Sequence, residues 1–158
     1  MTISPLLIYV DRLKDGSVDK FSESISTDFL GVCEKELSFN NQLSLSREIY
    51  VADDHLIIRL SAKTSAYVPC AICNMPVELT LIIDNFYHAQ PLVEISSGIF
   101  DLTEMLREDL LIQVPQFSEC SSGKCPARKE MKQFLKEESS SADSSHSFQY
   151  PFANLKTE

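Results

Sequence analysis

Two close pairs of cysteines constrain this chain more than any other feature of its sequence. Cys70 and Cys73 stand in the run PCAICNMP, and Cys120 and Cys125 stand in the run FSECSSGKCP. Thiolates at such spacings are typical ligands of a tetrahedral zinc ion. If all four cysteines bind one structural zinc ion, the fold has to bring the middle of the chain against its C-terminal third.

The same thiols have two other interpretations. Residues 74–119 separate the pairs, a longer interval than in a compact zinc ribbon, and the spacing of the second pair is the less common one, so reduced thiols without a metal remain an alternative. A redox-active CxxC is a third interpretation, although that motif opens a helix in a βαβ unit, whereas here it joins two predicted strands. Cys33 has no close partner, and we expect it to be a small buried apolar residue.

Composition excludes several classes of function. The 158 residues include only four glycines and contain no GxGxxG or GxxxxGK[ST] motif, so there is no phosphate-cradling loop. The formal net charge of -9 disfavours nucleic acid as a general partner and favours a basic protein. The N-terminal run MTISPLLIYVDRLKDG lacks the basic start of a signal peptide, and no apolar run reaches membrane-spanning length. We therefore expect a cytoplasmic location, where thiols stay reduced.

Alternation of apolar and polar residues predicts an antiparallel meander between residues 32 and 84. The clearest strand runs from His55 to Tyr67, and a second follows over residues 77–83. The CxxC pair therefore lies at the tip of a hairpin, where Asn74 suits the positive φ that such a turn requires. Asp53 and Asp54 predict the preceding hairpin turn.

The segments before and after this meander also carry patterns that predict secondary structure. Residues 6–10 predict a short strand, and residues 11–31 predict a loop with a short helix. Residues 101–113 predict a helix, which begins at a capping box of Asp101 and Glu104 and ends before Pro115. We expect its apolar stripe to bury against the strand at 77–83. The stripe consists of Leu102, Leu106 and Leu110.

A second helix is predicted over residues 126–138, and it carries the candidate nucleic-acid-binding stripe. Basic residues recur at every fourth position, which places them on one helix face. The alternative is an ordinary solvated face that is balanced by neighbouring glutamates. The stripe consists of Lys124, Arg128, Lys132 and Lys136.

These elements predict one α+β domain over residues 1–138. It consists of a mainly antiparallel sheet with the 101–113 helix packed on it and a C-terminal helix; curling of the sheet into a partial barrel is left open. Residues 139–158 predict a Ser-rich flexible linker and a tail with the run YPFANLK.

The order of these motifs resembles the YceD family, a bacterial and plastid family of 23S rRNA accumulation proteins. The resemblance rests on CAICNMPVELTL, FDLTEMLREDLLIQVP, the GKCP loop and the terminal PFANLK. The positions that match the family pattern are Asp101, Leu102, Glu108, Leu111, Pro115, Cys125 and Pro126. Ile72 and Asn74 depart from it, since family members typically carry CxRCLxP, and the acidic stretch before the helix is nearly missing.

The resemblance implies a non-enzymatic factor in the biogenesis of the large ribosomal subunit. Its expected partner is a large-subunit ribosomal protein or a 23S rRNA precursor, with no membrane and no small-molecule substrate. Two alternatives from other classes stay open. One is a zinc- or thiol-dependent redox or enzymatic module, and the other is an adaptor that docks through its YPFANL tail.

Overall fold

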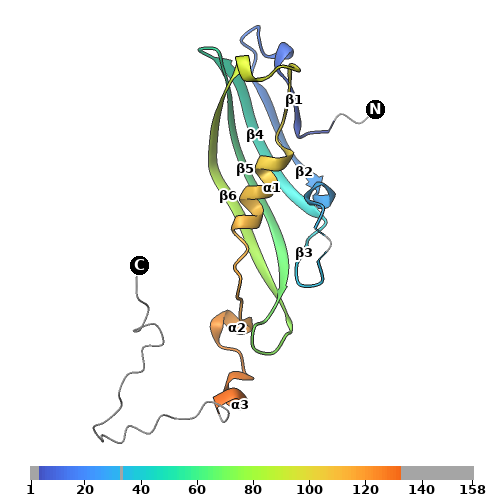
Figure 1. Ribbon diagram of the computed structural model, residues 1–158, viewed down its shortest axis with the longest axis vertical. Coiled ribbons are helices and arrows are strands. Elements are labelled where there is room, and N and C mark those ends of the chain that lie inside the picture. The colour runs from blue at the N-terminus through green and yellow to red at the C-terminus, as the bar shows by residue number, and fades with distance from the viewer. Residues whose placement is uncertain (1–3, 33, 133–158) are drawn as a thin grey trace, which may run out of the picture. The chain divides into compact units, whose positions relative to one another are not determined.

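The computed structural model describes residues 4–32 and 34–132, and its largest feature is one open antiparallel sheet (Figure 1). In this sheet β6 pairs with one edge of β5, β4 and the short β3 pair with the other edge, and β2 pairs with the far edge of β4. Its strands are β2 (Asp19–Ser26), β3 (Ser38–Phe39), β4 (Gln42–Ala52), β5 (His55–Pro69) and β6 (Pro76–Pro91). The α+β class is confirmed, and the sheet is not closed into a barrel.

The remaining elements are short. A two-stranded sheet joins β1 (Leu7–Tyr9) to β7 (Ile99–Asp101). The helices are α1 (Thr103–Ile112), α2 (Cys120–Gly123) and α3 (Arg128–Lys132), and the 3-10 turns are η1 (Val10–Arg12), η2 (Thr27–Leu30) and η3 (Leu92–Glu94). The chain separates into two units, Met1–Arg128 and Lys129–Glu158. The predicted linker and tail at 139–158 lie outside the described residues, as do residues 133–138 of the second predicted helix and Cys33.

One face of the sheet carries the hydrophobic core, and α1 lies against it (Figure 1). Leu56 and Ile58 of β5 are fully buried, while Arg59 between Ile58 and Leu60 is exposed. The stripe of α1 is buried as predicted, in the same cluster as Leu81 and Ile83 of β6. Its members Leu102, Leu106 and Leu110 are 0%, 2% and 0% exposed. We call this side of the sheet the inner face.

A bulge in β6 keeps the inner face continuous over the length of the strand. Ile83 pairs with Ala62 and Phe86 pairs with Leu60, so β6 carries one more residue than β5 between these two pairs. Asn85, which lies in this bulge, has a φ of 55°. A bulge shifts the alternation of side chains by one position. Side chains of β6 therefore point inward at odd positions before Asn85 and at even positions after it, where Phe86 packs against the core.

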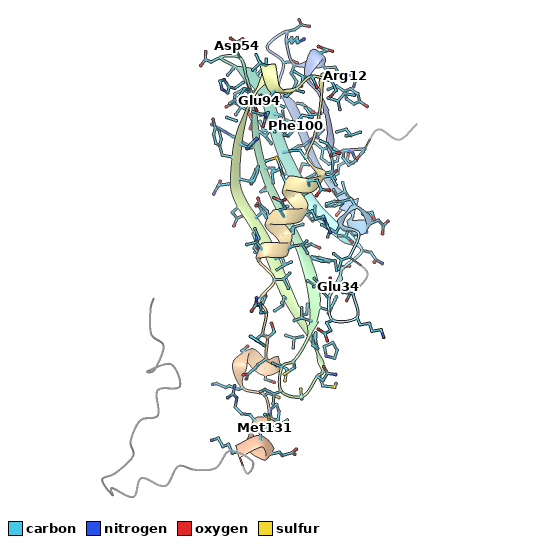
Figure 2. The ribbon with its side chains drawn as sticks, in the orientation of Figure 1. Arg12, Glu34, Asp54, Glu94, Phe100 and Met131 are labelled. Carbon is cyan, nitrogen blue, oxygen red and sulfur yellow. The ribbon has the colours of Figure 1, made fainter. Side chains whose placement is uncertain are left out.

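The predicted hairpin turn at Asp53 and Asp54 is confirmed, whereas the predicted start of α1 is borne out only in part. Asp53 and Asp54 form the two-residue turn between β4 and β5, with φ values of 46° and 59°, as a hairpin of this length requires. Asp54 also accepts a hydrogen bond from the backbone of Leu92, at 2.9 Å, which holds η3 beside this turn (Figure 2). Asp101 accepts a hydrogen bond from the Thr103 backbone at 2.8 Å, next to the start of α1. Glu104 pairs instead with Arg107 at 3.8 Å, so the predicted capping box of Asp101 and Glu104 is not formed.

The prediction for residues 11–31 was wrong in its main element. β2 is a strand of eight residues rather than a loop, and it pairs with β4 from Asp19 to Ser26. Its serines and charged residues hide the alternation, because only Phe21 and Ile25 are large apolar residues turned toward the core. Pairing with a neighbouring strand, which a local pattern does not record, makes this polar segment a strand.

Arg47 is the charged residue buried in the inner face. Its side chain is 7% exposed, lies 3.0 Å from the Asp19 carboxylate and donates to the Pro5 carbonyl oxygen. Burial lowers the pKa of Arg47, and the Asp19 carboxylate opposes that shift. A buried guanidinium needs such partners because desolvation is costly. Arg47 therefore fastens β2 and the N-terminal segment to β4.

Replacing Leu106 with alanine should lower the free energy of unfolding by about 2–5 kcal/mol, because the side chain is buried between α1 and the sheet. Urea denaturation gives this value. Ile112→Ala is the matched control, since Ile112 lies on the same helix but is 81% exposed. Equal effects of the two substitutions would contradict the packing of α1.

Candidate metal centre

The β5–β6 hairpin presents the first cysteine pair at its tip. Pro69 pairs with Pro76, and the loop between them closes with hydrogen bonds from Cys70 N to Met75 O at 2.8 Å and from Asn74 N to Cys70 O at 2.9 Å. Asn74 has a φ of 60°, as expected. This tight turn confirms the predicted hairpin tip and brings Cys73 back beside Cys70.

The segment that follows α1 delivers the second pair to the same place. Ser118 forms an isolated parallel bridge with Cys70, and the Ala71 backbone donates to the Ser118 carbonyl at 2.7 Å. Cys120 follows two residues later, and its backbone nitrogen lies 3.4 Å from Cys70 Sγ. A short strand-like contact thus joins two segments that are far apart in the sequence.

A left-handed turn returns the chain from Cys120 to Cys125. Ser121, Ser122 and Gly123 have φ values of 55°, 54° and 84°, although the segment forms part of α2. The left-handed conformation costs a residue with a side chain about 1–2 kcal/mol, so two consecutive serines in it indicate that other contacts impose this turn. Gly123 is the one residue here whose type indicates such a conformation in advance.

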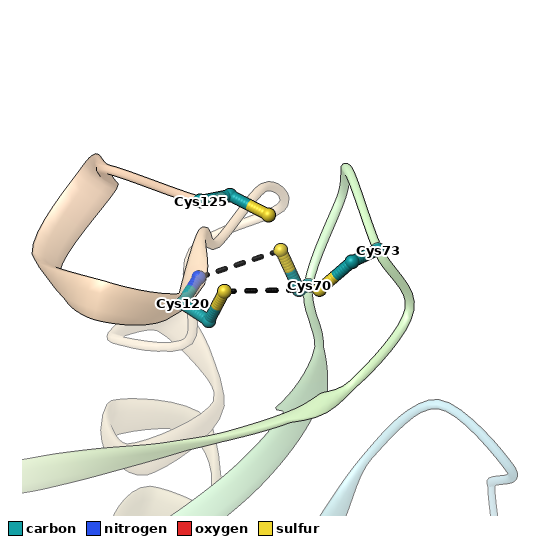
Figure 3. A group of neighbouring side chains, drawn as sticks. All are labelled: Cys70, Cys73, Cys120 and Cys125. Carbon is teal, nitrogen blue, oxygen red and sulfur yellow. Dashed lines mark hydrogen bonds between the residues drawn. The ribbon is translucent and has the colours of Figure 1, made fainter. Parts of the chain in front are cut away.

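The four sulfur atoms form one cluster (Figure 3). All of them lie within 4.8 Å of one another, and Cys73 Sγ lies 3.7 Å from Cys120 Sγ. Zinc–sulfur bonds of about 2.3 Å in a tetrahedron place sulfur atoms about 3.8 Å apart, so the spacing suits this ion. Cys70 and Cys125 are buried, and the other two are half-buried. Within residues 4–32 and 34–132, these four form the only group of three or more potential metal ligands.

Hydrogen bonds shift the pKa values of two of the clustered thiols in opposite directions. The pKa of Cys70 is lowered to about 6, because the backbone N–H groups of Cys73, Cys120 and Ile72 stabilise its thiolate. The pKa of Cys120 is raised to about 12, chiefly because its thiol shares its proton with Cys125. Burial raises the pKa of Cys125. The cluster therefore favours a thiolate at Cys70 and thiols at Cys120 and Cys125, whose protons a divalent cation could displace.

These contacts resemble those that support metal ligands in general. Cys70 Sγ accepts from two backbone N–H groups, Ile72 at 3.5 Å and Cys120 at 3.4 Å. Such outer contacts fix the direction of a ligand and reduce its negative charge. Four sulfur ligands would complete a tetrahedron around a zinc ion and would leave no free position of the kind that a catalytic zinc ion keeps for water.

The structure describes three of the four residues of the predicted basic stripe, and their surroundings differ. Lys124 is exposed, whereas Arg128 forms an ion pair with Glu119, the residue before Cys120. Lys132 is exposed and belongs to the second unit, and Lys136 lies outside the described residues. Within the described part of the chain the helix covers only Arg128–Lys132. The role of the stripe in binding nucleic acid stays a prediction.

Comparisons with known proteins found no match for this chain. No protein-family model, no curated protein and no solved structure matches this chain. In the part of the chain that the structure describes, no helix is long and apolar enough to cross a membrane. The sulfur cluster is therefore the feature on which a functional proposal can rest.

The turn at Asn74 gives a direct test of the hairpin geometry. Asn74→Ala should lower the free energy of unfolding by about 1 kcal/mol, since alanine tolerates a φ of 60° poorly. Asn74→Gly should leave it unchanged or raise it, because glycine adopts this conformation freely. Thermal melts of the two variants report the difference, and a stable alanine variant would contradict the left-handed turn.

Proposed function

We propose that this chain is a non-enzymatic assembly factor for the large ribosomal subunit, with a structural zinc ion held by its four clustered cysteines. The observation that carries the zinc assignment is the convergence of four sulfur atoms from two distant segments within 4.8 Å. A closed set of four thiolates supports a structural role, because it leaves no site for a reacting molecule.

The need for a metal follows from the lack of apolar burial around the hairpin tip. Met75 is 62% exposed and Phe117 is 80% exposed, so these two large apolar residues contribute little burial near the cysteines. Ordering this part of the chain therefore requires another source of free energy. Zinc would supply it by crosslinking the β5–β6 turn to the segment at 118–125, since structural zinc contributes directly to folding.

The ribosomal role rests on the resemblance to the YceD family together with the charge of the chain. A net charge of -9 suits a basic partner such as a ribosomal protein. A segment of 23S rRNA is the other partner that the resemblance implies. Holding such a partner during large-subunit maturation requires a folded binding surface and no catalytic group.

One observation favours a second candidate, a thiol redox module. Cys73 and Cys120 are both half-buried, and their sulfur atoms lie 3.7 Å apart. The lowered pKa of Cys70, about 6, adds a reactive thiolate beside them. A thiol that reacts rapidly with an alkylating reagent in the metal-loaded protein would favour this candidate over the structural centre. The adaptor alternative depends on the YPFANL tail, which lies outside the described residues.

Purified protein should contain one zinc ion per chain, measured by elemental analysis. Cys120→Ser should reduce the bound zinc and lower the melting temperature, because it removes one of four ligands. Ser118→Ala is the matched control, since Ser118 meets Cys70 and Ala71 through its backbone. Full zinc content in the Cys120 variant would refute the four-cysteine site.

Depletion of the protein in cells should reduce 23S rRNA relative to 16S rRNA. The tagged protein should migrate with large-subunit precursors on a density gradient. A selective loss of 23S rRNA would follow from failed maturation of the large subunit. An unchanged ratio, with the protein confined to the free fractions, would refute the ribosomal role while leaving the zinc assignment intact.

A further inference from the structure

The face of the sheet opposite α1, which we call the outer face, carries a trough across its strands. Ser22 of β2 is the register partner of Ser46 of β4, which in turn pairs with Ser61 of β5. This row of small side chains leaves two adjoining hollows, of about 600 Å³ and 550 Å³, which both border all three serines. The trough is thus a product of strand register.

An arginine between two tyrosines stands at one side of this trough. The Arg59 guanidinium carbon lies 6.0 Å from the ring centroid of Tyr50 and 6.0 Å from that of Tyr87. Arg59 and Tyr87 border the larger hollow, and Tyr87 is 58% exposed. Aromatic rings and guanidinium planes that are open to solvent offer stacking surfaces to flat ligands.

The charge of the trough differs from that of the whole chain. Its outward side chains include three bases, Lys20, Arg59 and Lys63, and two acids, Glu48 and Asp84. The chain as a whole has 14 basic and 23 acidic residues. Lys20 lies 3.7 Å from Glu48, so one of the acids already has a basic partner. The trough is therefore a local site where a polyanion meets no net repulsion.

We propose that the trough binds single-stranded RNA, with an unpaired base stacked on Tyr87 and phosphates at Arg59, Lys20 and Lys63. Open sheets that present aromatic side chains bind unpaired bases in this way. The serine hydroxyls donate and accept hydrogen bonds, which suits riboses and phosphates. This inference deepens the proposed function, on which it rests, by assigning RNA rather than a ribosomal protein to a defined surface.

The floor of the trough argues against a protein as its occupant. The centre of a protein interface is depleted in serine and needs desolvated apolar anchors. Here the central row consists of three serines, and Ile82, 45% exposed, is the large apolar side chain at the rim of the smaller hollow. A duplex is also disfavoured, because three basic side chains neutralise few of its phosphates.

Fluorescence anisotropy with a labelled 12-nucleotide single-stranded RNA tests the proposal on the full zinc-loaded chain. Tyr87→Ala and Arg59→Ala should each weaken binding about tenfold, whereas Tyr87→Phe should keep it, since the stacking ring remains. The slope of log affinity against log salt should be about -2 and should shrink by about 0.7 in Arg59→Ala. The same RNA in a hairpin duplex should bind more weakly.

Arg12→Ala is the matched control. Arg12 also lies over a tyrosine, 5.0 Å from the Tyr9 ring centroid, but this pair belongs to β1 and η1 and does not border the trough. Melting curves establish that each variant is folded, which the exposure of Tyr87 favours. Equal affinity of wild type and Tyr87→Ala, or an equal loss in Arg12→Ala, would overturn the proposal.

Two further outcomes separate this inference from the proposed function. A fall in 23S rRNA on depletion, together with no binding of the RNA probe, would overturn the RNA trough while leaving the ribosomal role to another surface. If a ribosomal protein bound in its place and lost affinity in Arg59→Ala, the occupant would be that protein and the RNA assignment would be wrong. RNA binding that depends on Tyr87, with normal 23S rRNA, would support the trough and refute the ribosomal role.

Discussion

The long antiparallel pairing of β5 with β6 is the constraint on which the rest of the structure depends. It runs from His55 opposite Pro91 to Pro69 opposite Pro76. At one end it closes the turn that holds Cys70 and Cys73, and along its length it directs apolar residues to α1. The bulge at Asn85 keeps Phe86 directed to the core, because without it the second half of β6 would present its inward side chains to the other face.

The same pairing divides the molecule into regions that are stabilised by different means. Along α1 the sheet buries large aliphatic side chains, which supply most of the favourable free energy of folding. At the hairpin tip Met75 is exposed, and the tightest group of side chains is the cluster of four thiols. A metal centre suits such a place because its stabilisation does not require a large buried apolar surface.

The two faces of the sheet differ in the side chains that they carry. The inner face is mainly apolar, and its buried charged residue, Arg47, pairs with Asp19 and the Pro5 carbonyl group. The outer face carries serines, tyrosines and charged residues that the core does not use. Antiparallel sheets commonly keep one face in contact with solvent. In this chain, the in-register serines on neighbouring strands turn that solvent face into a trough.

The sequence by itself determined the local features of this protein. Strict alternation predicted β5, the apolar stripe predicted α1, the Asp-Asp pair predicted the first hairpin turn, and Asn74 predicted the second turn. These features can be predicted from the sequence because each depends on residues that are close together in the chain. The spacing of the cysteines also nominated the correct four residues for the cluster, although it left open whether they meet.

Only the tertiary structure decided the features that depend on distant partners. The polar segment Asp19–Ser26 became a strand through pairing with β4, and Ser118 met Cys70 through a bridge that no local pattern contains. The left-handed turn at Ser121 and Ser122 likewise depends on contacts that bring Cys125 back to the hairpin. The physical reason is that strand register and chain crossings are set by the free energy of contacts between segments, which a single stretch of sequence does not specify.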